Sequence, residues 1–145
     1  MQVMELFTYG TLMFPKIWET VVGKGATALD AQPASLAGYE IRRFSGHEFP
    51  GIFESRRDVT PVPGTVYSGL STGQMDALDR YEDSAYFRDV VTVRLETGET
   101  LEAQTYVVRE AHRHRLSTDG WTAQWFEENA YETYFSGLTG DPMPR

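Results

Sequence analysis

Two β-rich runs joined by a short polar turn constrain the fold of this chain more than any other feature. They cover residues 86–95 and 100–108, and the turn between them contains Gly98. β-branched and aromatic residues favour strands, and a short glycine-containing turn between two such runs is typical of a β-hairpin. We therefore expect two long antiparallel strands in the second half of the chain.

Shorter runs with strand character lie elsewhere in the chain. They occupy residues 4–8, 36–44, 52–54 and 65–67. Pro61, Pro63 and Gly64 precede the last run and mark an edge or a loop, because proline donates no ladder hydrogen bond. Glycine at position 69 is expected to end that strand.

Three segments predict helices, at residues 14–22, 71–81 and 121–135. Pro15 suits the first turn of the first helix. Ser71 and Gln74 have the spacing of a capping box, which makes the second helix the best specified. A few helices scattered among many strands predict an α+β domain built round a curled antiparallel or mixed sheet.

The length of 145 residues suits one domain. We assign residues 1–137 to this single domain, because Gly137 is expected to end the last helix. Residues 138–145 are expected to form a loose C-terminal tail.

The composition narrows the function classes. The absence of cysteine excludes disulfides, thiolate nucleophiles and cysteine-ligated metals, and it fits a reducing cytoplasm. No apolar run approaches the roughly 20 residues of a membrane span, and no leader pattern opens the chain. The net charge of −8 disfavours nucleic acid. We expect a cytoplasmic protein that binds neither nucleic acid nor membrane.

The segment Tyr9-Gly10-Thr11-Leu12 follows the first predicted strand. Loops at strand ends expose backbone N–H groups, and Gly10 permits a ligand to approach the main chain closely. The loop therefore predicts a site for an acidic ligand. An ordinary strand-to-helix turn is the alternative interpretation, and by residue type alone it is favoured.

A carboxylate at the end of the second predicted helix is the candidate base. Glu82 shares a helical face with Met75 and Leu78, which turns it toward the protein body. Desolvation beside Tyr81 and Tyr86 would raise the pKa of this carboxyl toward neutral, as a general base requires. A solvated acid at a helix end is the alternative.

Other charged residues near Glu82 are alternative candidates for the base or form ion pairs. Asp79 and Asp83 are rival carboxylates, which a helix would turn more toward solvent. Arg88 either pairs with an acid such as Asp79 or faces water.

The histidines carry weaker signals. His112 and His114 lack a third ligand nearby, so we expect a solvated basic loop there and no metal site. His47 precedes a turn and is a weak candidate for the cleft. The triplet at residues 23–25 is interpreted as a helix stop and not as a phosphate loop, because it follows a helix and lacks the spaced Gly-Lys-Ser/Thr pattern.

These segments together resemble the gamma-glutamylcyclotransferase superfamily. The residues that carry the resemblance, in family order, are Tyr9-Gly10-Thr11-Leu12, Pro50-Gly51-Ile52, Gly64-Thr65-Val66-Tyr67, Leu78-Asp79-Arg80-Tyr81-Glu82, Tyr86 and Arg88. The layout most resembles the compact branch named after avirulence-induced genes (AIG2-like), because the tryptophan-rich segment 121–135 closes the chain. The resemblance covers roughly the whole chain and implies a small, partly closed mixed or antiparallel β-barrel with flanking helices.

The resemblance also implies a reaction that needs no metal or cofactor. The α-amine of a γ-glutamyl group attacks its own γ-carbonyl, which gives 5-oxoproline and a free amine. Glu82 corresponds to the general acid/base of the family, and Tyr86 is expected to line the cleft. The substrate loop corresponds to Tyr9, Gly10, Thr11, Leu12, Met13 and Phe14. The implied partner is a small γ-glutamyl compound.

Two other functions stay open on the sequence. One is a non-catalytic module that binds a small acid or a partner, and the other is a γ-glutamyl amide hydrolase that releases glutamate. The leaving amine, the pathway and the oligomeric state are not determined by the sequence.

Overall fold

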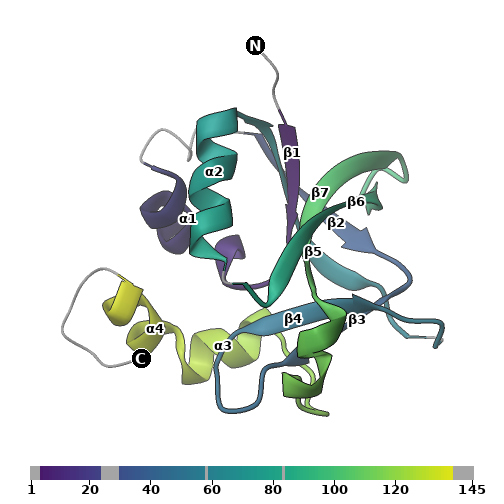
Figure 1. Ribbon diagram of the computed structural model, residues 1–145. Coiled ribbons are helices and arrows are strands. Elements are labelled where there is room, and N and C mark those ends of the chain that lie inside the picture. Colours follow the sequence, from purple (N-terminus) through teal and green to yellow (C-terminus); the bar gives the residue numbers. More distant parts are fainter. Residues whose placement is uncertain (1–3, 24–29, 58, 83, 139–145) are drawn as a thin grey trace.

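The computed structural model, which describes residues 4–23, 30–57, 59–82 and 84–138, has a closed five-stranded β-barrel at its centre (Figure 1). In spatial order its strands are β1 (Met4–Thr8), β5 (Val62–Leu70), β2 (Asp30–Leu36), β6 (Tyr86–Leu95) and β7 (Thr100–Val108). Neighbouring strands are antiparallel, except that β7 and β1 close the barrel in parallel. The predicted α+β class with a small mixed barrel is confirmed.

The hairpin that the sequence predicts most strongly is present with the predicted bounds. β6 and β7 pair from Tyr86 opposite Val108 to Arg94 opposite Thr100. Gly98 takes a φ of 92° in the turn, which is a left-handed conformation that favours glycine. This pair is the longest ladder of the barrel, and its turn is specified locally.

A second, two-stranded sheet lies beside the barrel. It pairs β3 (Tyr39–Arg43) with β4 (Pro50–Glu54) in antiparallel register. The prediction of one strand over residues 36–44 is wrong, because Gly38 forms a turn at a φ of 84°. β2 ends before this turn, and β3 leaves the barrel to join the second sheet.

β5 is longer than the sequence predicts. The strand contains Pro63, Gly64 and Gly69, and it lies between β1 and β2, so the edge or loop expected at Pro63 and Gly64 and the strand end expected at Gly69 are wrong. Pro63 pairs near the start of the strand, where the missing N–H is tolerated. Gly64 is required by close packing: a Cβ there would lie 2.2 Å from the Thr8 carbonyl oxygen.

Three helical segments, all before β6 in the sequence, cover one side of the barrel. They are the 3-10 helix η1 (Thr11–Met13), α1 (Pro15–Val22) and α2 (Thr72–Tyr81), and α1 and α2 lie side by side (Figure 1). The predicted capping box is confirmed: the Gln74 N–H donates to Ser71 Oγ at 3.2 Å, and the Ser71 N–H donates to Gln74 Oε1 at 2.8 Å.

The last predicted helix is two helices. After the 3-10 helix η3 (Glu110–Arg115) come α3 (Ala123–Asn129) and α4 (Tyr131–Leu138), with a break at Ala130. The break brings the rings of Phe126 and Tyr134 together edge to face, with centroids 5.5 Å apart. Gly137 lies inside α4, so the helix end expected there is wrong. Of the predicted tail, only Leu138 lies within the described residues.

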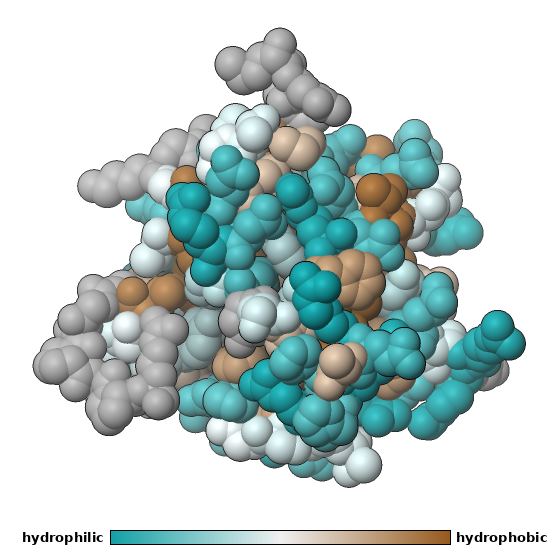
Figure 2. Space-filling view, viewed as in Figure 1, coloured by the Kyte–Doolittle hydropathy of each residue, from teal (hydrophilic) through white to brown (hydrophobic). Residues whose placement is uncertain are grey.

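The core combines aromatic stacking with aliphatic packing. The rings of Trp18 and Tyr67 stack with centroids 3.8 Å apart, which fixes α1 against β5. The face of the molecule in Figure 2 is mostly hydrophilic, with small separated apolar patches. In the part of the chain that the structure describes, no helix has the length and apolar character needed to cross a bilayer.

The close crossing of β5 and β1 predicts that Gly64→Ala destabilises the fold. The added methyl group would meet the Thr8 carbonyl and the ring of Phe7, so overpacking should cost about 1–3 kcal/mol in the free energy of unfolding. Urea denaturation measures this loss. The matched control is Gly120→Ala, where a Cβ meets nothing within 4 Å and the change should stay within about 0.5 kcal/mol. Equal stabilities of the two variants would contradict the described packing.

Candidate active site

A cavity of about 580 Å³ lies where the end of the barrel meets the second sheet and the C-terminal helix. The loop after β1, the β3–β4 loop, the end of α2 and α4 all contribute to its wall. The lining residues are Leu6, Phe7, Thr8, Tyr9, Gly10, Thr11, Leu12, Gly46, His47, Glu48, Phe49, Pro50, Tyr81, Glu82, Tyr86, Tyr106, Thr133, Tyr134 and Gly137. Such a volume is typical of a small-molecule site.

The structure brings most of the predicted site residues to this cavity. The segment 9–12, Glu82 and Tyr86 all line it, whereas Met13 and Phe14 do not. The Phe14 ring instead packs on Phe126 and Tyr131, with centroids 5.3 and 5.1 Å away. The roles of these residues stay predictions, but the part of the loop that reaches the cavity is shorter than the sequence suggests.

The first N–H groups of the 3-10 helix η1 precede its hydrogen-bonded turn. The first hydrogen bond of η1 runs from the Met13 N–H to the Gly10 carbonyl oxygen at 3.0 Å. The N–H groups of Thr11 and Leu12 therefore have no partner inside η1, and no side chain caps the helix. These groups are the candidate donors at the cavity wall.

Gly10 lies against Pro50, the first residue of β4. A Cβ at Gly10 would be 2.9 Å from Pro50 Cγ, so the loop and β4 pack at a distance that only glycine allows. The Pro50 carbonyl accepts the Tyr86 hydroxyl at 2.6 Å. The packing thus joins the loop, β4 and β6 on one side of the cavity.

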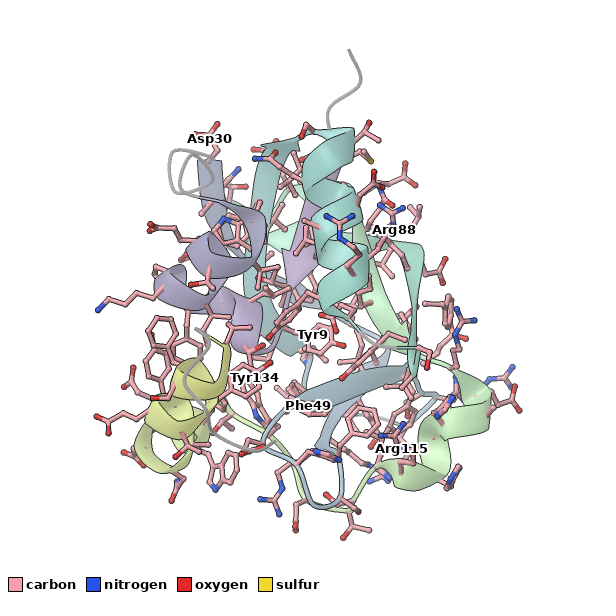
Figure 3. The ribbon with its side chains drawn as sticks, turned by 60° about the vertical axis from the view of Figure 1, so that its left-hand side comes forward. Tyr9, Asp30, Phe49, Arg88, Arg115 and Tyr134 are labelled. Atoms are coloured by element: carbon pink, nitrogen blue, oxygen red, sulfur yellow. The ribbon has the colours of Figure 1, made fainter. Side chains whose placement is uncertain are left out.

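A chain of hydroxyl groups fixes the loop to two helices. Thr11 Oγ1 and the Tyr81 hydroxyl are hydrogen-bonded at 2.8 Å, and the Tyr81 hydroxyl is also bonded to that of Tyr134. The labelled side chains of Tyr9, Phe49 and Tyr134 line the cavity from the loop after β1, the β3–β4 loop and α4 (Figure 3). The wall is therefore held by contacts that are distant in sequence.

Glu82 lies at the end of α2, where its N–H donates to the Leu78 carbonyl at 2.9 Å. Burial raises the pKa of the hydroxyls of Tyr9, Tyr81 and Tyr106, and the charge of Glu82 raises each of them further. These three phenols therefore stay neutral near neutral pH. None of these phenols can act as a base near neutral pH.

The structure resolves the alternatives for Arg88. Its Nη2 lies 3.4 Å from Asp79 Oδ2, so the two side chains form an ion pair. Asp79 also accepts the Tyr106 hydroxyl at 2.6 Å. Asp79, one of the two rival carboxylates, is thus bound to Arg88 and Tyr106 and does not line the cavity of about 580 Å³. The other, Asp83, lies outside the described residues.

Sequence reasoning missed several residues of the wall. Tyr106 lies opposite Arg88 in the hairpin register, so counting outward from the predicted turn would have found it. Tyr134 has no local signal, because α4 brings it to the cavity only through tertiary packing. His47, a weak candidate, lies in the wall.

The histidine pair near the end of β7 lies away from this cavity. His112 and His114 are in η3, which replaces the expected loop, and Arg115 is hydrogen-bonded to the His112 ring at 3.3 Å. Within the described ranges, no three His, Cys, Asp or Glu side chains are placed to hold one metal ion.

The comparisons with known proteins agree with this architecture. A family model described as gamma-glutamyl cyclotransferase, AIG2-like, matches residues 6–123, and the chain belongs to this family. The AIG2-like protein C of Arabidopsis thaliana is 32% identical over 104 residues, and Protein AIG2 B of the same plant is 30% identical over 104 residues. The match covers 71% of this chain but only 58% and 59% of those relatives' lengths.

Solved structures share the fold. The solution structure of an Arabidopsis thaliana protein has a TM-score of 0.70 at 24% identity, and the match covers 96% of this chain and 81% of the other. A structure named gamma-glutamyl cyclotransferase has a TM-score of 0.64 at 16% identity, with 99% and 93% covered. At these identities the similarity shows the fold alone.

The contact between Gly10 and Pro50 predicts that Gly10→Val strongly weakens the binding of a ligand at the loop. The branched side chain would force the loop from β4 and displace its N–H groups, and errors of about 1 Å in a site cost up to roughly 100-fold. Isothermal titration with 5-oxoproline measures the affinity, and a thermal melt checks folding.

Thr11→Ser is the matched control, because serine keeps both the N–H group and a hydroxyl for Tyr81. Its affinity should stay within about twofold of the wild type. If a folded Gly10→Val variant bound 5-oxoproline with wild-type affinity, the loop would not be part of the binding site.

Proposed function

We propose that this protein is a γ-glutamylcyclotransferase that converts the γ-glutamyl group of a small amide to 5-oxoproline and releases the amine. One observation carries the proposal: Glu82 and the loop residues Gly10, Thr11 and Leu12 line the same cavity. An internal aminolysis needs a base at the attacking nitrogen and donors at the developing oxyanion, and this wall offers both kinds of group.

Glu82 would act as the proton carrier. The α-nitrogen forms a bond to the γ-carbon, and the bond from that carbon to the leaving nitrogen breaks. The ring nitrogen keeps one of the three protons of the α-ammonium group. Glu82 transfers the other two to the leaving nitrogen, which is released as a protonated amine. One carboxylate suffices, because both nitrogens are bound to the same carbon in the tetrahedral intermediate.

The loop would stabilise the oxygen of that intermediate and orient the substrate carboxylate. No basic side chain lies in the segment 9–14, so anion recognition there depends on backbone N–H groups. Because hydrogen bonds and ring packing already fix these groups, little reorganisation is needed when charge develops. The cavity also holds the flexible glutamyl chain in a shape that favours ring closure.

The product distinguishes this proposal from its alternatives. A cyclotransferase gives 5-oxoproline, a hydrolase gives glutamate, and a binding module gives neither. A panel of γ-glutamyl amines and amino acids with chromatographic detection of both products identifies the reaction and the leaving amine together.

Glu82→Gln should lower kcat by about 10²–10⁴-fold, because the amide keeps the shape of the side chain but cannot carry a proton. The rate of 5-oxoproline release measures the loss, and circular dichroism checks the fold.

The control on the same helix is Asp76→Asn, an exposed residue outside the cavity, which should keep the wild-type rate. A folded Glu82→Gln enzyme with full activity would exclude Glu82 from the mechanism.

A further inference from the structure

Three phenols of the cavity wall donate their only hydroxyl proton within the protein. Tyr9 donates to the Tyr106 carbonyl at 2.7 Å, Tyr86 to the Pro50 carbonyl at 2.6 Å, and Tyr106 to Asp79 Oδ1 at 2.6 Å. A phenol has one proton and can also accept hydrogen bonds through its oxygen. Toward the cavity these oxygens can therefore only accept.

Tyr106 is the phenol best placed to use this property. Its proton goes to a carboxylate, whereas the protons of Tyr9 and Tyr86 go to backbone carbonyls. Among the described residues, no N–H or O–H group donates to the Tyr106 oxygen. Donation to a carboxylate also polarises the phenol and strengthens its oxygen as an acceptor.

Tyr106, Glu82 and Tyr86 line two cavities, and we call these three shared residues the partition. The second cavity has a volume of about 430 Å³. Asp79 and Arg88 line only the second cavity, and Asp79 accepts the Tyr106 proton on that side. The Arg88 guanidinium binds Asp79 Oδ2 and leaves Oδ1 for the phenol.

We propose that Tyr106 accepts a hydrogen bond from the α-ammonium of the bound ligand beside Glu82, so that a free α-ammonium group is a requirement of recognition. Asp79 is the positioning residue, which keeps the phenol proton out of the cavity. The identity of the ligand as a γ-glutamyl compound rests on the proposed function. The acceptor geometry itself rests only on the hydrogen bonds of the wall.

An ammonium group suits this place for a physical reason. It has three donors and no acceptor, and here it meets a carboxylate and a neutral phenol oxygen. A carboxylate or carbonyl oxygen of the ligand would instead face the lone pairs of the Glu82 carboxylate and the Tyr106 oxygen, and it would find no hydrogen-bond donor in either group. The partition thus selects the amine end of the ligand, and the N–H groups of the loop select the acidic end.

The test compares two ligands that differ at the α-carbon, L-glutamate and glutarate, which lacks the ammonium group. Isothermal titration should show that the wild type prefers L-glutamate. Tyr106→Phe should lower the affinity for L-glutamate by about tenfold or more, because a hydrogen bond to a charged group is lost. The affinity for glutarate should change by less than about twofold. Asp79→Leu should do the same, whereas Asp79→Asn should be milder because its amide oxygen still accepts the phenol proton.

The matched control is Tyr67→Phe, which removes the same atom from a buried tyrosine that lines neither cavity. It should leave both affinities unchanged. Equal losses for the two ligands in Tyr106→Phe would show a structural role and overturn the proposal. A wild type that does not prefer L-glutamate, including one that binds neither ligand, would also overturn it.

The 5-oxoproline assay separates this inference from the proposed function. If the wild type forms no 5-oxoproline but Tyr106 still controls the ligand preference, the cyclotransferase proposal fails and the ammonium site stands. If 5-oxoproline forms and Tyr106→Phe leaves the preference unchanged, only the ammonium site fails.

Discussion

The closure of the barrel through β1 is the constraint on which the rest of the structure depends. This strand pairs antiparallel with β5 and parallel with β7, and the Thr105 hydroxyl donates to the Phe7 carbonyl at 2.9 Å. The Thr8 hydroxyl reaches the Thr65 carbonyl at 2.9 Å on the other side. With its strand held on both edges, the loop that begins at Tyr9 is fixed over the end of the barrel.

The site is assembled round that loop by groups from distant parts of the chain. Gly10 packs on Pro50, Thr11 is hydrogen-bonded to Tyr81, and Tyr9 is hydrogen-bonded to the backbone of Tyr106. Each contact satisfies a buried polar group or fills space, and each also fixes a wall of the cavity. The contacts that stabilise the fold therefore also hold the walls of the candidate site in place before any ligand binds.

The sequence predicted the elements whose signals are local and missed those set by tertiary packing. The hairpin of β6 and β7 and the capping box of α2 follow from neighbouring residues, so both were predicted correctly. Whether Pro63 lies in a central strand depends on β1 and β2, and the break at Ala130 depends on ring packing. The loop and Glu82 were identifiable because the family resemblance combines them, whereas Tyr134 reaches the cavity only through the fold.

A crystal structure of the complex with 5-oxoproline tests the central claim, that the loop and Glu82 form one site, most directly. The account predicts that ligand oxygens lie about 2.7–3.2 Å from the N–H groups of the Gly10–Leu12 loop, with the Glu82 carboxylate beside the ring nitrogen. A ligand bound elsewhere, or one held by the loop while Glu82 lies out of hydrogen-bond reach of its nitrogen, would contradict it.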